Sequence, residues 1–517
     1  MSDTVRVAAV QIEARDLEDA PATLDELLRL VDQAVDAGAQ MIVTPECGYP
    51  AYFIGLRNAE TVDAREALAP LAERARRGRC TIVAGLALRD HEGVLRNAAV
   101  CIGPDGEELG RTGKSFLWHF DWLWFRAASE FPVWHTPIGP VGALVCADGR
   151  QPEVARMLAL RGARILADCT AWVAWGATSE ALDSAHCQYF MPVRAQENGC
   201  WVVAADKWGV ERDSIVYAGR STVIDPDGNT VSCLGPTGSG VLVADIDVAR
   251  ATGPRLRRRP ELYGLLTEPT SRLPVLRGLG APEVLRAPDR RAAAAAGMWT
   301  DHARLAHLWE ALRDAACALA VLPVAADGEA TLAAARRLTA QGGGEIVVAG
   351  APAGGPTWTA LVRHGEVALR REDSHAASAS GPLPEVVQTG LGRSALLVGD
   401  ELFVPEVARH AALSGAEVLC WSGLRAPADL KRWARARADE NRVWVIAASP
   451  DEALIVSPAS AVVARSLRGR TMAASAQVWR ALAHHKEMAP GTDVVLSRIP
   501  EAYGLMCRVQ AVAGAAG

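Results

Sequence analysis

Apolar runs and amphipathic segments alternate along the first half of the chain. Residues 5–10 are mostly apolar, as in a buried strand, and residues 21–37 place apolar side chains at helical spacing. Gly38 ends the helical pattern, and residues 40–44 form the next apolar run. Continued along the chain, the same pattern predicts strands at 80–87, 95–102, 141–146, 163–168, 200–205 and 220–224, and helices near 60–77, 151–161 and 177–198. Strands that alternate with helices in this way favour a layered α/β architecture.

Short segments of the first half recur in the second half in the same order. Pro152-Glu-Val-Ala-Arg156 returns as Pro405-Glu-Val-Ala-Arg409. Glu197-Asn198, which stands just before an apolar strand, returns as Glu440-Asn441 in the same setting. Because the order is kept, we interpret the pattern as the duplication of a unit of roughly 200 residues, which is too long for a solenoid repeat.

This duplication predicts two domains of the same fold. We place the first domain at residues 1–268 and the second at residues 299–517. Residues 269–298 are rich in Pro, Gly and Arg and contain the run Arg290-Arg-Ala-Ala-Ala-Ala-Ala-Gly297. We therefore expect a connecting segment there that is partly helical.

The composition narrows the class of protein. Half of the residues are hydrophobic, 22% are charged and the net charge is -6, as in ordinary globular proteins that stay in solution. No dense run of Lys or Arg predicts a nucleic-acid or membrane partner, and without a signal-peptide pattern we expect a cytoplasmic location. The 11 cysteines form no CxxC pair, and the sequence has no phosphate-binding loop or dinucleotide fingerprint. We therefore expect neither a metal site nor a cofactor.

Three reactive side chains stand at or near the ends of predicted strands. Glu46 follows the run 40–44, Cys146 ends the run 141–146, and Lys114 precedes a segment rich in tryptophan. A lone cysteine in such a place is most often a small buried hydrophobe. A thiol accompanied by a carboxylate and an ammonium group indicates instead acyl transfer through a thioester.

At these positions the chain resembles the nitrilase superfamily of carbon–nitrogen hydrolases, over residues 5–265. The shared motifs are Val7-Ala-Ala-Val-Gln11, Thr44-Pro-Glu46, Arg111-Thr-Gly-Lys114, Cys146-Ala-Asp148-Gly-Arg150 and Arg194-Ala-Gln-Glu197-Asn198. The resemblance implies an α-β-β-α sandwich and a Glu-Lys-Cys triad that works without a cofactor.

The resemblance also implies a role for each triad member. Cys146 is the nucleophile, and Glu46 is the general base that takes the thiol proton and returns it to the leaving nitrogen. Lys114 and the backbone N–H of Ala147 stabilise the oxyanion. Next to the nucleophile, Asp148 and Arg150 are expected to fix the turn that presents Cys146.

The superfamily has a second acid shortly after the lysine, close to aromatic residues. Asp121 is the expected counterpart here, with Glu130 further along the chain as the alternative. Aromatic residues near the predicted site are candidates for substrate binding, although each could equally be core filler: Tyr49, Trp118, Trp122 and Trp172.

The substrate class follows from the residues after the nucleophile. The sequence Cys146-Ala-Asp148 is similar to the amidase and carbamoylase branches, so we expect a small-molecule amide or N-carbamoyl substrate. Acyl transfer to an amine, nitrile hydrolysis and a non-catalytic scaffold remain alternatives. Relatives often carry Asn where Asp206-Lys207 stands, so this pair either changes what is bound or forms an ion pair at the surface.

The second copy lacks all three triad functions. Alignment of the repeated segments places Gly399 at Cys146, Asp373 at Lys114 and Val324 at Glu46. We expect a degenerate domain that pairs with the first as an intramolecular pseudo-dimer, because members of the superfamily commonly pair through a two-fold interface. A homo-oligomer built on this tandem is also expected to be possible.

Overall fold

The computed structural model describes residues 4–279, 288–297, 302–376, 381–424, 428–467 and 472–509. The chain forms two compact units. The first consists of Met1–Arg255, Ala489–Thr492 and Ser497–Met506, and the second of Leu256–Met488, Asp493–Leu496 and Cys507–Gly517. Short C-terminal segments thus belong to the first unit. The domain limits of 268 and 299 describe the sequence repeat and stay a prediction.

The first unit contains two sheets. The larger, eight-stranded sheet has the order β11-β10-β1-β2-β3-β4-β5, and β14 also pairs with β1. Its strands are β11 (Ile215–Ala218), β10 (Lys207–Glu211), β1 (Thr4–Glu13), β2 (Met41–Val43), β3 (Thr81–Arg89), β4 (Leu95–Ile102), β5 (Glu108–Gly113) and β14 (Gly240–Asp247). The six-stranded sheet has the order β13-β12-β9-β8-β7-β6, made of Thr230–Cys233, Thr222–Ile224, Trp201–Ala205, Ile165–Cys169, Gly139–Val145 and Val133–Thr136.

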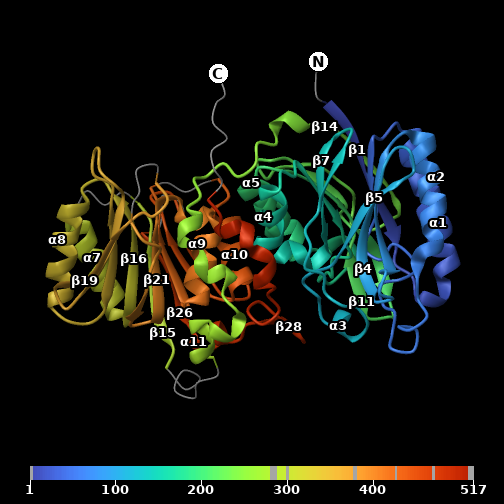
Figure 1. The fold of residues 1–517 in the computed structure, drawn as a ribbon. Coiled ribbons are helices and arrows are strands. Elements are labelled where there is room, and N and C mark those ends of the chain that lie inside the picture. The colour runs from blue at the N-terminus through green and yellow to red at the C-terminus, as the bar shows by residue number, and fades with distance from the viewer. Residues whose placement is uncertain are drawn as a thin grey trace, which may run out of the picture. The chain divides into compact units, whose positions relative to one another are not determined.

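Helices cover the outer faces of the two sheets. In Figure 1, α1 (Ala20–Asp36) and α2 (Leu68–Gly78) lie on the side of the larger sheet, and α4 (Pro152–Leu160) and α5 (Met191–Asn198) lie on the side of the other sheet. Helix α1 buries side chains spaced three or four residues apart, including Leu27, because one face packs on the sheet. The predicted α-β-β-α sandwich is confirmed.

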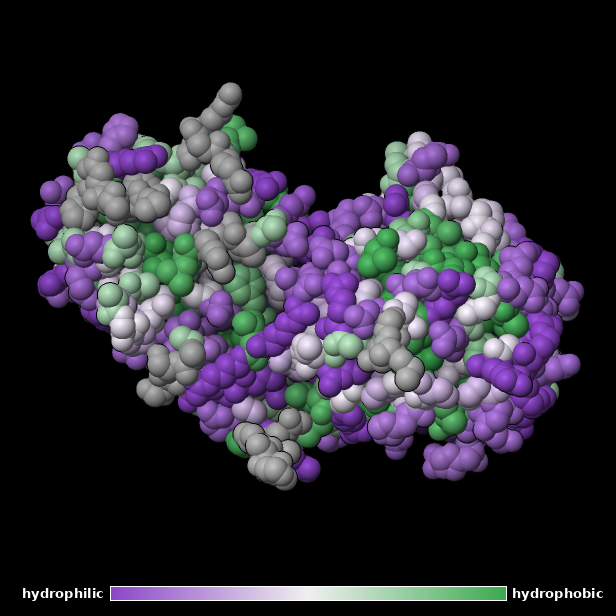
Figure 2. All heavy atoms as spheres, turned by 90° about the horizontal axis from the view of Figure 1, so that it is seen from above, coloured by the Kyte–Doolittle hydropathy of each residue, from purple (hydrophilic) through white to green (hydrophobic). Residues whose placement is uncertain are grey.

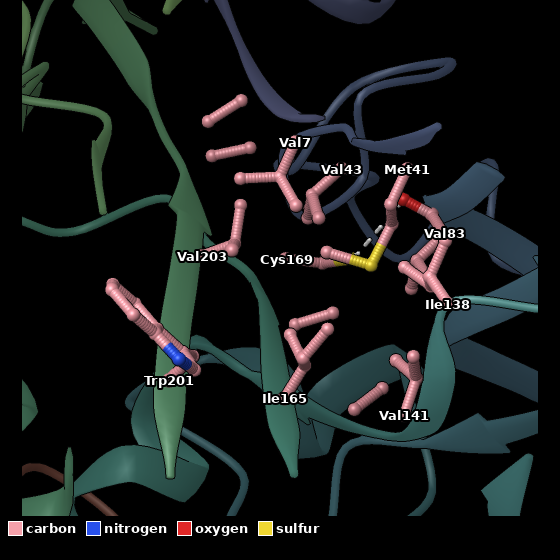
Figure 3. Packing of buried hydrophobic residues seen from close by; sticks show 14 of the residues in the cluster. Val7, Met41, Val43, Val83, Ile138, Val141, Ile165, Cys169, Trp201 and Val203 are labelled. Carbon is pink, nitrogen blue, oxygen red and sulfur yellow. Dashed lines mark hydrogen bonds between the residues drawn. The ribbon is translucent and has the colours of Figure 1, made fainter. Parts of the chain in front are cut away.

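The core between the two sheets consists mostly of aliphatic side chains. It includes Val7, Met41, Val43 and Val83 of the larger sheet, facing Val141, Ile165 and Val203 of the smaller one (Figure 3). A second core cluster, with Leu27 and Leu71, lies between the larger sheet and α1 and α2. Strands buried on both faces explain why the apolar runs in the sequence are nearly continuous.

The second unit repeats this architecture. Its first sheet has the order β19-β18-β17-β16-β15-β26, made of Glu366–Glu372, Trp358–Arg363, Glu345–Gly350, Cys317–Ala325, Arg290–Ala295 and Ala473–Val478. Its second sheet has the order β20-β21-β22-β23-β24-β25, made of Val386–Thr389, Gly392–Val398, Val418–Ser422, Trp444–Ala448, Ala453–Val456 and Val462–Arg465. The helices are α7 (His302–Asp314), α8 (Gly328–Ala340), α9 (Pro405–Leu413), α10 (Leu430–Asn441) and α11 (Arg480–His484).

Two predicted segments have a different structure. The connecting segment is partly helical as expected, with 3-10 turns at Thr270–Arg272 and Pro274–Arg277, but its alanine run is not: Arg290–Ala295 form β15, which pairs with β16 and with the edge strand β26. Pairing on both sides outweighs the intrinsic helix preference of alanine. The helix predicted at 177–198 is also shorter: a separate 3-10 turn stands at Ser179–Ala181, and the continuous helical segment consists of a π-helical turn at His186–Phe190 and α5.

The surface is polar with scattered apolar patches. Figure 2 shows hydrophilic residues over most of the face in view, with smaller groups of hydrophobic residues between them. Within the described residues, no helix has the length and apolar character that crossing a membrane requires.

Candidate active site

The three predicted reactive residues lie at the ends of strands in the first unit. Glu46 follows β2, Lys114 follows β5, and Cys146 follows β7 of the facing sheet. Glu46 and Lys114 are fully buried, and Cys146 retains 7% of its surface. The sandwich therefore brings together side chains that are far apart in sequence, as an active site of this type requires.

Lys114 is the centre of a buried ionic network. Its Nζ donates hydrogen bonds to Glu46 Oε1 at 2.7 Å and to Asp121 Oδ2 at 2.6 Å. Asn97 Nδ2 donates to the same oxygen of Glu46 at 2.6 Å. Nζ also lies 5.5 Å from the ring centroid of Tyr52. The cation is thus held between two carboxylates, each fixed by a further neighbour.

The electrostatics of this network suit proton transfer. Burial raises the pKa of Glu46, and the positive charge of Lys114 offsets this only in part. Burial alone lowers the pKa of Lys114, but the charges of Asp121 and Glu46 outweigh it and raise that pKa well above its usual value. Burial, followed by the charge of Glu46, also raises the pKa of the Cys146 thiol. The resting thiol is therefore protonated and needs a base, while Lys114 stays cationic.

Cys146 occupies a sharp turn between a strand and a helix. Its φ of 48° is in the left-handed region, and it begins the 3-10 turn Cys146–Arg150 that leads into α4. The backbone N–H of Cys146 donates to Asp168 Oδ1 at 3.1 Å, and Sγ lies 3.7 Å from the carbonyl oxygen of Ala171. Such a left-handed turn costs conformational energy and holds the sulfur at the edge of the sheet.

Asp148 links the nucleophile turn to the lysine strand. Its Oδ1 accepts hydrogen bonds from Ser115 N, Ser115 Oγ and Phe116 N at 2.9, 2.7 and 2.8 Å, and its Oδ2 accepts from Val145 N at 3.1 Å. One carboxylate therefore fixes the residues next to both Lys114 and Cys146. The Arg150 guanidinium stacks over the Trp118 ring at 4.3 Å.

Several buried carboxyl oxygens around the nucleophile lack a hydrogen-bond partner. Glu46 Oε2, Asp121 Oδ1 and Asp168 Oδ2 have no hydrogen-bond partner among the described residues. Burial raises the pKa of Asp168 well above its usual value, and the hydrogen bond from the backbone N–H of Cys146 offsets this only in part. The described residues contain no group of three or more metal-ligating side chains.

The remaining site candidates have different positions. Asp121 contacts Lys114, whereas Glu130 is exposed and lines a separate cavity of about 540 Å³ beside Arg89 and Arg111. Ala147 follows Cys146 in the buried turn. The geometry thus supports Asp121 as the second acid.

The four aromatic candidates divide into two groups. Trp172 is fully buried, stacks on His186 at 5.5 Å and follows Ala171, whose carbonyl faces Cys146. The backbone of Trp118 donates to Asp121 Oδ2 at 3.0 Å. Tyr49 instead packs in the core toward α1 and α2, and Trp122 is 52% exposed. The structure brings only Trp118 and Trp172 to the site.

Of the two alternatives for Asp206 and Lys207, the ion pair at the surface is wrong. Both side chains are buried, and Asp206 Oδ1 accepts the backbone N–H of Trp172 at 2.7 Å. Lys207 Nζ lies 3.9 Å from Glu211, whose other oxygen accepts from Phe53 N. The polar pair is therefore internal, and Asp206 positions the segment that carries Trp172.

Two residues of the network were not predicted from the sequence. Asn97 is a buried polar residue in the otherwise apolar strand β4, and this isolated polarity was a usable signal. Asp168 is likewise a buried polar residue in the otherwise apolar strand β8, next to its last residue. A buried polar side chain in such a strand requires a partner, which here belongs to the site.

The equivalent position in the second unit keeps the hydrogen bonds around the turn but lacks the three reactive side chains. Glu401 accepts from Ser374 N, Ser374 Oγ and Val398 N at 2.8, 2.5 and 3.0 Å, as Asp148 does from Ser115 and Val145. Gly399, with φ +62°, follows Val398, and Asp373 precedes Ser374. A Cβ at Gly399 would overlap Asp373 Oδ2. Here the carboxylate occupies the space that a nucleophile would need.

Comparisons with known proteins agree with this geometry. The family model of the carbon-nitrogen hydrolases matches residues 6–255 and 359–483, which is well over half of the chain. A nitrilase from Pyrococcus abyssi is 30% identical over 265 residues, which span 50% of this chain and 96% of the relative. A citrullinase from Francisella tularensis is 28% identical over 279 residues, covering 50% of this chain and 96% of that protein.

Further similarities concern amidases. An omega-amidase from Mus musculus is 28% identical over 264 residues, covering 48% of this chain and 90% of that protein. Among solved structures, an amidase from Nesterenkonia sp. is 28% identical with a TM-score of 0.43, covering 48% of this chain and 91% of that chain.

Proposed function

Because the chain belongs to the carbon–nitrogen hydrolase family, we propose that its first unit cleaves a small amide or N-carbamoyl compound through a thioester on Cys146. The observation that carries this proposal is the buried contact of Lys114 with Glu46 and Asp121 beside a cysteine at a strand end. The proposal extends the family assignment, which makes the chain a carbon–nitrogen hydrolase, to a mechanism.

In the first half of the reaction, Cys146 Sγ attacks the carbonyl carbon and its proton passes to Glu46. A C–S bond forms, and the oxygen becomes an anion that Lys114 Nζ and the N–H of Ala147 stabilise. The C–N bond then breaks as Glu46 returns the proton to the nitrogen, which leaves as ammonia or an amine. The raised pKa of Glu46 supports this exchange, because the residue holds a proton near neutral pH more readily than a free carboxylate does.

In the second half, water replaces the thiol. Glu46 takes a proton from water as its oxygen attacks the thioester carbon, and the C–S bond breaks. The thiolate recovers the proton, and the acid leaves. Asp121 keeps Lys114 aimed at the oxyanion throughout, since it accepts a second hydrogen bond from the ammonium group that Glu46 also binds.

Amide or carbamoyl hydrolysis is the first candidate because the nucleophile is followed by Ala147 and Asp148, as in the amidase and carbamoylase branches it resembles. The relatives named omega-amidase and citrullinase support this choice. Nitrile hydrolysis is the second candidate, which the 30% identity to the nitrilase from Pyrococcus abyssi favours.

The test is release of ammonia from a panel of primary amides, N-carbamoyl amino acids and nitriles. We expect turnover of an amide or carbamoyl compound, its loss by at least about a thousandfold in Cys146→Ala, and its retention in Cys169→Ala. Cys169 is a matched control because it is also a buried cysteine at the end of a strand in the first unit. Turnover of nitriles alone would favour the second candidate, and equal loss in both variants would contradict the role of Cys146.

A further inference from the structure

The last part of the chain contributes to the active-site region of the first unit. Residues Ala489–Thr492 and Ser497–Met506 belong to that unit, although they follow the whole second repeat in sequence. Thr492 is fully buried. Its Oγ1 accepts the backbone N–H of His119 at 2.8 Å and donates to the carbonyl oxygen of Leu117 at 3.0 Å. One hydroxyl therefore closes both ends of the turn 117–119.

This turn leads directly to the lysine network. His119 has a φ of 50°, in the left-handed region. This conformation is unfavourable for a residue with a side chain, so contacts with neighbouring residues must stabilise it. Trp118 N donates to Asp121 Oδ2 at 3.0 Å, and Asp121 N donates back to Trp118 O at 2.9 Å. The same Oδ2 accepts from Lys114. Thr492 is thus connected to the ammonium group of Lys114 through the turn 117–119 and the carboxylate of Asp121.

Two further contacts hold the same region. Gly491, with φ +77°, lies against Trp122, and a Cβ there would be 2.5 Å from Trp122 Nε1. Tyr503 stacks on Phe131 with ring centroids 6.4 Å apart and planes 20° apart. The exposed Trp122, which does not reach the site, therefore has a packing role beside the threonine.

We propose that Thr492 is a positioning residue for the active site, which sets the turn 117–119 and through it the contact of Asp121 with Lys114. This inference rests on the proposed function, because it assigns Lys114 to the oxyanion. It also gives the C-terminal segment a part in the chemistry of the first unit. Loss of the hydroxyl leaves the His119 N–H without its acceptor and releases the strained turn.

The experiment compares Thr492→Val, Thr492→Ser and Thr339→Val in the full chain. Thr339 is a matched control in the second unit: it is fully buried, its hydroxyl donates to Ala335 O at 2.9 Å, and it accepts from Gly365 N at 3.1 Å. For each protein we would measure kcat and KM with the best amide of the panel, the rate of Cys146 alkylation by iodoacetamide, and hydrogen exchange of residues 115–121.

In Thr492→Val we expect kcat to fall about tenfold with a smaller change in KM, because the lysine acts on the transition state. Exchange at 115–121 should rise, the serine variant should restore both values, and Thr339→Val should change neither. Unchanged kcat and exchange in Thr492→Val would overturn the inference, as would equal losses in both valine variants.

The outcomes also separate this inference from the proposed function. If the wild-type protein turns over no amide and Cys146 is alkylated no faster than other thiols, the proposed function fails. The exchange of residues 115–121 still decides whether Thr492 holds the turn. If the wild-type protein is active and the valine variant equals it, only the role of Thr492 fails.

Discussion

Substitution of Lys114 by Met should destabilise the first unit, because it removes the cation from a buried pair of carboxylates. Lys114 is fully buried and is the cation that Glu46 and Asp121 share. Met has a similar length and no charge, so Lys114→Met leaves two carboxylates facing each other in the interior. Like charges in low dielectric repel, and neither carboxylate gains a new partner.

The size of the effect should depend on pH. Removing one partner of a buried ion pair typically costs about 3–5 kcal/mol when the other stays charged. Burial already raises the pKa of Glu46, and loss of Lys114 removes a charge that lowers it, so that pKa rises further. A carboxyl group whose pKa is higher in the folded than in the unfolded protein lowers the stability of the fold as the pH rises, so its contribution is most favourable at low pH. We therefore expect about 3–5 kcal/mol of destabilisation at pH 8 and clearly less at pH 5.

Native-state hydrogen exchange measures this cost unit by unit. Peptides from β3 and β4 report on the first unit, and peptides from β17 and β18 in the second unit are the internal control. The double variant Glu46→Gln with Lys114→Met should recover part of the loss, because one unpaired charge is gone. A cost below about 1 kcal/mol, or an equal cost at pH 5 and pH 8, would refute the assignment of a charged network.

Two further predictions concern the second unit. Gly399→Cys should lower the free energy of unfolding of this unit by about 1–3 kcal/mol in urea, because the new Cβ overlaps Asp373. The new thiol should also react slowly with alkylating agents, and rapid alkylation at position 399 would contradict this. Burial raises the pKa of Asp373 to about 7, so the wild-type unit loses stability as the pH rises from about 4 through 7. Asp373→Asn should therefore stabilise the unit more at pH 8 than at pH 5, and hydrogen exchange of β17 should show a difference of at most about 3 kcal/mol between the two pH values. An equal effect at both pH values would show that the carboxyl does not titrate in this range.

The sequence predicted features that depend on local periodicity. Residues 5–10 and 141–145 lie within buried strands because their apolar runs match the two-sided burial of central strands. Glu46 and Cys146 stand just after such runs, so their strand-end positions followed from the pattern. The tandem of two sandwiches followed from repeated segments, and the family match over both halves confirms it.

Features that depend on distant partners could not be predicted. The run Arg290–Ala295 has helical propensity and becomes a strand only because β16 and β26 pair with it. Tyr49 stands three residues after Glu46, yet it packs on the opposite face, toward α1 and α2. Thr492 carries no local signal at all, since its partners Leu117 and His119 lie more than 370 residues earlier in the chain.

The central claim is that Cys146 carries the acyl group, and trapping the thioester tests it most directly. The full chain and its Glu46→Gln variant would be exposed to the best amide, quenched in acid and examined by intact mass and peptide mapping. We predict a mass increase equal to the acyl group less one hydrogen, confined to the peptide that contains Cys146, and formed much more slowly in Glu46→Gln because the first half of the reaction also needs this base. Amide turnover with no adduct on Cys146, or an adduct on Cys420 of the second unit, would contradict the account.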